Sequence, residues 1–195
     1  LQVSRNGQLV HQSVLGRAPL EAGTPRTDDS IVRMRSMTKP ITSVAMMMLV
    51  EQGLVALDDP VHRHIPAWRD LAVYVAGGSG LPGAPALWQT KPVEAPMRII
   101  DLLSHTSGLT YGFPSRTNVD AAYRANKIDA LERDDGLDGF IDALTKVPLE
   151  FSPGTAWNYS VSTDVLGFLV SKFSGLPFDE FLRQRILRPL GMQDT

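Results

Sequence analysis

The segment at residues 36–52 constrains the fold of this chain more than any other. Its interior, residues 41–50, is apolar on almost every side and includes three consecutive methionines, so the sequence predicts a helix buried on most of its surface. Gly53 is the expected stop. Pro40 fits near the start, because the first N–H groups of a helix have no helical partner. Such a helix needs other elements packed around it, which predicts a globular domain.

A hairpin is expected at the start of the chain. Residues 1–16 alternate around Asn6-Gly7, a strong hairpin signal, which predicts antiparallel strands at residues 2–5 and 8–15. The Gly- and Pro-rich residues 77–96 predict a long surface excursion. Apolar spacing, caps and breakers predict five further helices, at residues 99–104, 119–128, 137–145, 162–174 and 178–187.

These elements predict an α+β fold in two parts. Residues 1–35 form the hairpin and its connection, and residues 36–195 form the nucleophile helix and a mainly helical region. No stretch approaches the roughly 18 apolar residues of a membrane span, since the longest apolar run covers only residues 44–50. The chain begins at Leu1 without a methionine, so an export signal would lie upstream, and the sequence leaves cytoplasm and periplasm equally open.

Composition narrows the partners and the chemistry. The chain has 19 Lys and Arg against 21 Asp and Glu, which gives no basic footprint for nucleic acid. A small neutral or weakly charged molecule is therefore the expected partner, and the oligomeric state is left open. Cysteine is absent, so thiolate nucleophiles and thiolate metal sites are excluded and a hydroxyl must do any nucleophilic work.

The candidate nucleophile stands at the mouth of the apolar helix, in Ser36-Met37-Thr38-Lys39. A spacing of three on a helix puts the Ser36 hydroxyl and the Lys39 amine side by side. Serine attacks an acyl carbon only when a base removes its proton, and a lysine is a base only when neutral. Bringing a lysine pKa from 10.4 to near 7 requires about 4.6 kcal/mol. A helix N-terminus supplies at most ~2 kcal/mol, so burial and a third residue are needed.

Tyr159 is the candidate for that third residue. It lies just before the helix expected at residues 162–174, in a loop from which a side chain can project into a cleft. Its hydroxyl can accept the serine proton, pass it to a leaving group and exchange protons with the lysine. An ordinary, partly buried tyrosine is the competing interpretation.

The order of motifs along the chain points to a known family. The motifs are Ser36-Met37-Thr38-Lys39-Pro40, Leu57-Asp58-Asp59-Pro60-Val61, Asp101-Leu102-Leu103-Ser104-His105-Thr106-Ser107-Gly108-Leu109, Phe151-x-Pro153-Gly154 leading to Tyr159-Ser160, and Arg188-Pro189-Leu190-Gly191-Met192. This succession resembles the serine β-lactamase-like, penicillin-binding protein family, and is most similar to family VIII carboxylesterases. The resemblance implies a β-lactamase/transpeptidase-like fold, an α/β sandwich plus a helical domain, present as an N-terminal fragment without the C-terminal strands. It also implies that residues 1–35 belong to the sandwich half.

The same resemblance implies roles for individual residues. The family's nucleophile falls on Ser36, its lysine on Lys39 and its tyrosine on Tyr159. One oxyanion donor is implied at the backbone N–H of Ser36, and the second on a Lys/His/Trp-x-Gly strand outside this chain. The β-lactamase and peptidase form of the tyrosine motif is Tyr-x-Asn, whereas Val161 stands here, so an amide that would grip a β-lactam or peptide is missing. That difference favours an ester substrate.

The sequence gives weaker support to a dinucleotide site, a serine–histidine triad or a metal site. The G-x-G-x-x-G at residues 78–83 lacks a following helix for a dinucleotide, and His105 lacks a G-x-S-x-G partner for a triad. His62 and His64, expected to be exposed, lack a third metal ligand, and residues 134–138 lack the calcium-loop spacing. We therefore expect a carboxylesterase without cofactor or metal. The alternatives are a β-lactamase, DD-peptidase or acyltransferase of the same fold, or a non-catalytic binding protein.

Overall fold

The computed structural model describes residues 1–17, 23–77, 87–130 and 134–195. The chain divides into two compact units. The first comprises Leu1–Ser36 with Asp194, and the second comprises Met37–Gln193 with Thr195. The glycine-rich loop at residues 78–83 that the sequence excluded as a dinucleotide site lies outside the described residues.

The first unit is built on the predicted hairpin. Strand β1 (Gln2–Arg5) pairs antiparallel with β2 (Gln8–Gln12), with an irregularity in register between Val3 and Ser4. Asn6 and Gly7 both have positive φ, which the tight turn requires. The second strand is shorter than predicted, because Ser13 already bonds to Leu1 and later residues have no partner left in β1.

The nucleophile helix starts two residues later than predicted. A single 3₁₀ turn, η1 (Arg35–Met37), precedes α1 (Thr38–Glu51), and Gly53 with positive φ follows the helix. The prediction that this helix is buried on most of its surface was wrong for the described residues. One face of α1 packs on α5 (Ser162–Ser174) and α6 (Phe178–Leu182), whereas Val44 and Met47 are 50% and 43% exposed. The difference arises because only one side of α1 has a packing partner in this part of the chain.

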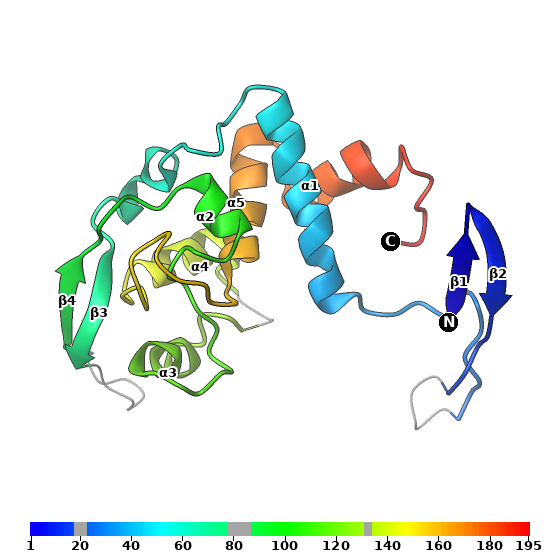
Figure 1. The fold of residues 1–195 in the computed structure, drawn as a ribbon, viewed down its shortest axis with the longest axis horizontal. Helices are drawn as coiled ribbons and strands as arrows, with labels where there is room; N and C mark the ends of the chain where they lie inside the picture. Colours follow the sequence, from blue (N-terminus) through cyan, green and yellow to red (C-terminus); the bar gives the residue numbers. More distant parts are fainter. Residues whose placement is uncertain (18–22, 78–86, 131–133) are drawn as a thin grey trace. The chain divides into compact units, whose positions relative to one another are not determined.

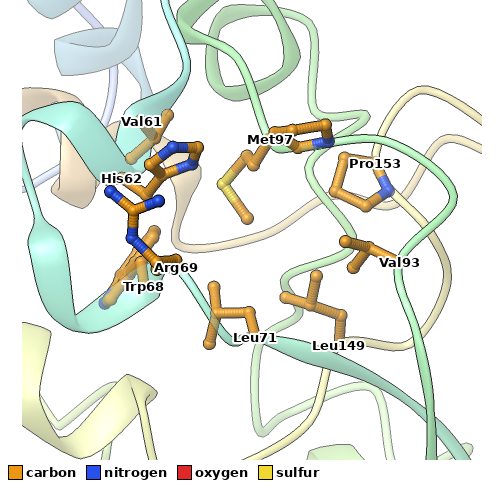
Figure 2. Close-up of a pocket in the computed structure, with 10 residues that line it drawn as sticks. Val61, His62, Trp68, Arg69, Leu71, Val93, Met97, Leu149 and Pro153 are labelled. Carbon is orange, nitrogen blue, oxygen red and sulfur yellow. The ribbon is translucent and has the colours of Figure 1, made fainter.

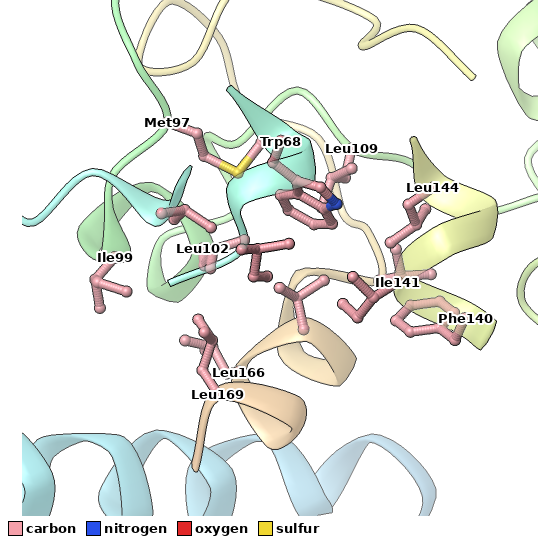
Figure 3. Close-up of a cluster of buried hydrophobic side chains, with 14 of the residues drawn as sticks. Trp68, Met97, Ile99, Leu102, Leu109, Phe140, Ile141, Leu144, Leu166 and Leu169 are labelled. Atoms are coloured by element: carbon pink, nitrogen blue, oxygen red, sulfur yellow. The ribbon is translucent and has the colours of Figure 1, made fainter. Parts of the chain in front are cut away.

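The core of the second unit lies beside α5 (Figure 3). Side chains from η3 (Pro66–Trp68), α2 (Ile99–Leu103) and α4 (Gly136–Leu144) meet those of α5 there. The labelled members are Trp68, Met97, Ile99, Leu102, Leu109, Phe140, Ile141, Leu144, Leu166 and Leu169. Burial of each large apolar side chain contributes about 1.5–3 kcal/mol, so this cluster fixes α5 and the loops at its N-terminus.

The remaining elements complete the second unit (Figure 1). They are η2 (Val61–Arg63), β3 (Ala72–Gly77), β4 (Trp88–Pro92), α3 (Asn118–Ala125) and the π-helical η4 (Arg183–Leu187). The prediction of a long surface excursion at residues 77–96 was partly wrong, because β4 within that range pairs antiparallel with β3. Thr117 caps α3, and its side chain accepts from the Asp120 N–H. Within the described ranges, no helix combines the length and apolar character that crossing a bilayer requires.

Candidate active site

Lys39 and Tyr159 lie together in the second unit. Lys39 is half-buried in the first turn of α1, and its Nζ lies 4.6 Å from the centre of the Tyr159 ring. The same Nζ donates a 3.3 Å hydrogen bond to the hydroxyl of Tyr111. The sequence singled out Lys39 and Tyr159 and missed Tyr111. Both aromatic side chains present electron-rich atoms to the amine.

Tyr159 is positioned by a loop that is bonded on both sides of it. The Asn158 N–H donates to the His105 carbonyl at 2.9 Å, and the Val161 N–H donates to the Thr110 carbonyl at 3.2 Å. The loop thus runs along the segment that leads to Tyr111. Backbone hydrogen bonds either side of a residue fix where its side chain points, and they account for the 5.3 Å between the two tyrosine ring centres.

Asn158 fixes this arrangement through its side chain. That side chain is buried, its Nδ2 donates to the Leu109 carbonyl at 3.1 Å, and its Oδ1 accepts from Arg116 at 2.8 Å. A buried amide with both ends bonded holds two chain segments at a set separation. Sequence reasoning missed this residue, although an amide directly before the candidate tyrosine was visible.

Asp164 is the second missed residue. It lies in the first turn of α5, and the Tyr111 hydroxyl donates to its Oδ2 over 3.5 Å. Part of the Asp164 residue is exposed, but the surrounding protein still desolvates its carboxylate and so raises its pKa, and the charge of Lys39 partly opposes that rise. Burial also raises the pKa of Tyr111 well above its ordinary value, with a further contribution from the Asp164 charge. Tyr111 is therefore a neutral hydroxyl throughout the physiological range.

His105 packs against the candidate tyrosine. Its ring centre lies 5.1 Å from that of Tyr159, and its Nδ1 lies 3.2 Å from the hydroxyl of Ser160. Burial lowers the pKa of His105, and the Lys39 charge lowers it further. The residue also adopts positive φ. These contacts agree with a structural histidine that supports Tyr159.

A chain of buried hydroxyls lies behind this loop. Ser160 bonds to Ser162 at 2.8 Å, and Ser162 bonds to Ser107 at 2.7 Å. All three residues are fully buried. Because each hydroxyl has a partner, the chain joins the Tyr159 loop to the Ser107 turn without leaving a polar group unsatisfied.

Ser36 is the last residue of the first unit and the middle residue of η1. It is exposed, and Arg35 before it has a positive φ of 53°, a sparsely populated conformation for a residue with a side chain. Such outliers are common at functional sites. The roles of Ser36 as nucleophile and oxyanion donor stay predictions, as do the roles of Lys39 and Tyr159.

A separate, mostly apolar pocket lies near η2 and β3 (Figure 2). Its lining includes His62, Trp68, Met97 and Leu149, and none of the three candidate catalytic residues. His62 and His64 are half-buried rather than exposed as expected, and His64 stacks edge-on against Phe173. In the part of the chain that the structure describes, no three His, Cys, Asp or Glu residues form a group suited to a metal ion.

The comparison with protein families covers the whole sequence. A family model described as Beta-lactamase matches residues 1–195. The chain belongs to this β-lactamase family. Among solved structures, EstCE1, "a hydrolase with promiscuous acyltransferase activity", superposes with a TM-score of 0.76 at 25% identity, over 96% of this chain and 45% of that one. The predicted α+β, β-lactamase/transpeptidase-like fold is thereby confirmed.

Curated relatives in the β-lactamase family include two named esterases. Esterase EstB of Burkholderia gladioli is 36% identical over 98% of this chain and 45% of its own length. Lovastatin esterase of Penicillium rubens is 32% identical over 97% of this chain and 45% of its own length. The chain thus spans a little under half the length of these relatives, and the predicted resemblance to β-lactamase-like esterases is confirmed.

Proposed function

We propose that the full-length protein is a serine carboxylesterase that works through an acyl-enzyme. The observation that carries the proposal is the contact between Lys39 and Tyr159. Lys39 lies three residues after Ser36 in the sequence. An amine and a phenol in contact, close in the sequence to a candidate alcohol nucleophile, are suited to moving a proton from that alcohol. The substrate in this proposal is a small ester, and no cofactor takes part.

The proposed reaction has two halves. The Ser36 hydroxyl oxygen adds to the ester carbonyl while its proton passes to the Lys39 and Tyr159 pair. The carbon–oxygen bond to the alcohol then breaks, and the alcohol leaves with that proton. Water next adds to the acyl-enzyme, the pair takes a proton from it, and the acid is released with Ser36 reprotonated. The Ser36 N–H supplies one oxyanion donor, and we assign the second to a segment outside this chain.

An ester is favoured over a β-lactam by Val161. It is buried and directly precedes α5, so it offers no amide to a substrate at the third position of the tyrosine motif. The relatives named as esterases, EstB and lovastatin esterase, support the same choice. The promiscuous acyltransferase activity of EstCE1 supports acyl transfer as a second candidate, in which an alcohol replaces water in the second half-reaction.

A fluorophosphonate probe tests the nucleophile. The full-length wild-type protein should be labelled, Ser36→Ala should not, and Ser13→Ala, a control beside the first hairpin, should be labelled normally. Absence of wild-type labelling would support the non-catalytic binding protein. Values of kcat/KM for p-nitrophenyl butyrate and nitrocefin then separate esterase from β-lactamase. Adding a primary alcohol and measuring the ratio of new ester to free acid separates hydrolysis from acyl transfer.

A further inference from the structure

One hydroxyl group joins the candidate catalytic amine to a carboxylate. The Tyr111 oxygen accepts from Lys39 Nζ at 3.3 Å and donates to Asp164 Oδ2 at 3.5 Å. Lys39 and Asp164 come from the first turns of α1 and α5, and these two helices pack on each other. The amine and the carboxylate are thus no more than two hydrogen-bond lengths apart, on elements held by the core.

Tyr111 can only bridge these groups as a neutral phenol. Burial keeps its pKa far above the physiological range, so it does not compete with Lys39 for a proton. Phe113 stacks on its ring with centres 5.2 Å apart, which helps to hold the phenol in place. A neutral hydroxyl that donates to a carboxylate presents its lone pairs to the ammonium.

We infer that Asp164 is a positioning residue that acts through the Tyr111 hydroxyl to hold the Lys39 amine and to set how tightly that amine keeps its proton. The inference deepens the proposed esterase function, because it concerns the proton-transfer pair of that site. Asp164 itself touches no reacting atom. Its negative charge stabilises the ammonium, so its loss makes Lys39 release its proton at lower pH.

Other charged and titratable groups around the bridge act on the same equilibrium. Lys39 is faced by Tyr159 from the loop before α5, and its charge also reaches His105. Asp129, whose carboxylate accepts from the Gly112 N–H at 2.8 Å, adds negative charge near Asp164 and Tyr111. Asp129 therefore acts on the bridge through its charge, whereas Asp164 is bonded to the hydroxyl that holds the amine.

The experiment is an NMR titration of full-length protein carrying ¹³Cε-lysine, with the Lys39 signal assigned by its loss in Lys39→Arg. In Asp164→Asn the midpoint of the Lys39 titration should fall by roughly 0.5–2 pH units, the range for a unit charge ~7 Å away in a partly screened site. Asp164→Glu keeps the charge and should restore most of the wild-type midpoint. Tyr111→Phe should reduce the effect of Asp164→Asn, because the bridge is gone.

Asp138→Asn is the matched control. Asp138 occupies the same position in the first turn of α4 that Asp164 occupies in α5, and both residues are exposed. It should change thermal stability through the helix end while leaving the Lys39 midpoint in place. An unchanged Lys39 midpoint in Asp164→Asn, with only a stability change like that of the control, would overturn the inference.

The pH dependence of kcat/KM separates this inference from the proposed function. If the rising limb of the pH profile of kcat/KM moves to lower pH together with the Lys39 midpoint, the role of Asp164 and the proposed esterase function are both supported. If the NMR midpoint moves and the rate profile does not, Asp164 still controls Lys39, and the assignment of Lys39 as the proton acceptor fails. The titration itself requires no esterase activity, so it decides the inference even for an inactive protein.

Discussion

The Nζ of Lys39 lies 4.6 Å from the ring centre of Tyr159, although 120 positions of sequence separate the two residues. The S-x-x-K motif predicts that burial and a third residue help the Lys39 amine to give up its proton. In the structure the amine of Lys39 contacts the Tyr159 ring face and the Tyr111 hydroxyl oxygen.

Tyr159→Phe and Lys39→Ala should each lower kcat for p-nitrophenyl butyrate by about 10²–10⁴-fold in the full-length protein, the usual contribution of general acid–base catalysis. The cause is loss of proton transfer rather than of folding, so the melting temperature should change little.

Two variants outside the site serve as controls for these losses. Lys172→Ala removes an exposed lysine that also lies over an aromatic ring, that of Phe168 at 6.0 Å. Tyr74→Phe removes a hydroxyl that accepts from Asn118 at 2.9 Å. Both should keep near-normal kcat, and near-normal turnover in Tyr159→Phe would contradict the assignment of Tyr159.

Ser162→Ala should lower the free energy of unfolding by about 1–3 kcal/mol, because it removes the hydroxyl that links the buried hydroxyls of Ser107 and Ser160. Urea denaturation measures the change. Ser171→Ala, in the same helix, removes only a weak bond to the Gly167 carbonyl and should cost about 0.5 kcal/mol or less. Equal losses in the two variants would show that the hydroxyl chain adds no stability.

The sequence predicted elements whose signals are local. Helix α5 spans Ser162–Ser174 as predicted, because Gly175 with positive φ ends it, and the first hairpin turns at Asn6-Gly7 as predicted. The start of α1 was placed two residues early, because nothing in Ser36-Met37-Thr38 distinguishes a 3₁₀ turn from an α-helical one.

The site could be predicted only in part, because its contacts are long-range. The S-x-x-K motif and Tyr159 stand out in the sequence, whereas Tyr111 and Asp164 carry no local pattern that marks them. Their approach depends on α1 packing against α5 and on the loop before α5 pairing with residues 105–110. Their position just after the motifs at residues 101–109 and 159–160 is the only signal that could have singled them out.

Mild acid should destabilise the fold through His105. Burial lowers the pKa of His105 in the folded protein below its ordinary value, so between the two values the unfolded chain binds more protons. The free energy of unfolding should therefore fall as the pH drops below about 6.5. Guanidinium denaturation at pH values of about 7.5 and 5.5, on either side of that ordinary value, measures this loss.

His105→Asn isolates this effect, because asparagine tolerates the positive φ of that position better than most residues. The variant should be less stable at the higher pH and should lose less stability on acidification than the wild type. Burial also lowers the pKa of His64, so part of the acid sensitivity should remain. If the free energy of unfolding of the variant had the same pH dependence as that of the wild type, His105 would not be a cause of the acid sensitivity.

Gly108→Ala should be the most damaging small substitution near the site. Gly108 has a φ of 84°, and an added Cβ would collide with the Phe151 carbonyl oxygen and lie 3.1 Å from the Leu149 Cβ. The Glu150 N–H donates to the Gly108 carbonyl at 2.8 Å, so the two segments cannot separate without losing that bond. We expect a loss of more than about 3 kcal/mol in the free energy of unfolding.

Gly175→Ala separates strain from collision. Gly175 has a similar φ of 71°, but nothing lies within 4 Å of an added Cβ, so only the left-handed backbone is penalised, by about 1–2 kcal/mol. The difference between the two variants in thermal denaturation measures the close approach at Gly108. Because the segment that follows Gly108 carries Tyr111 and pairs with the Tyr159 loop, Gly108→Ala should also lower kcat, whereas Gly175→Ala should not.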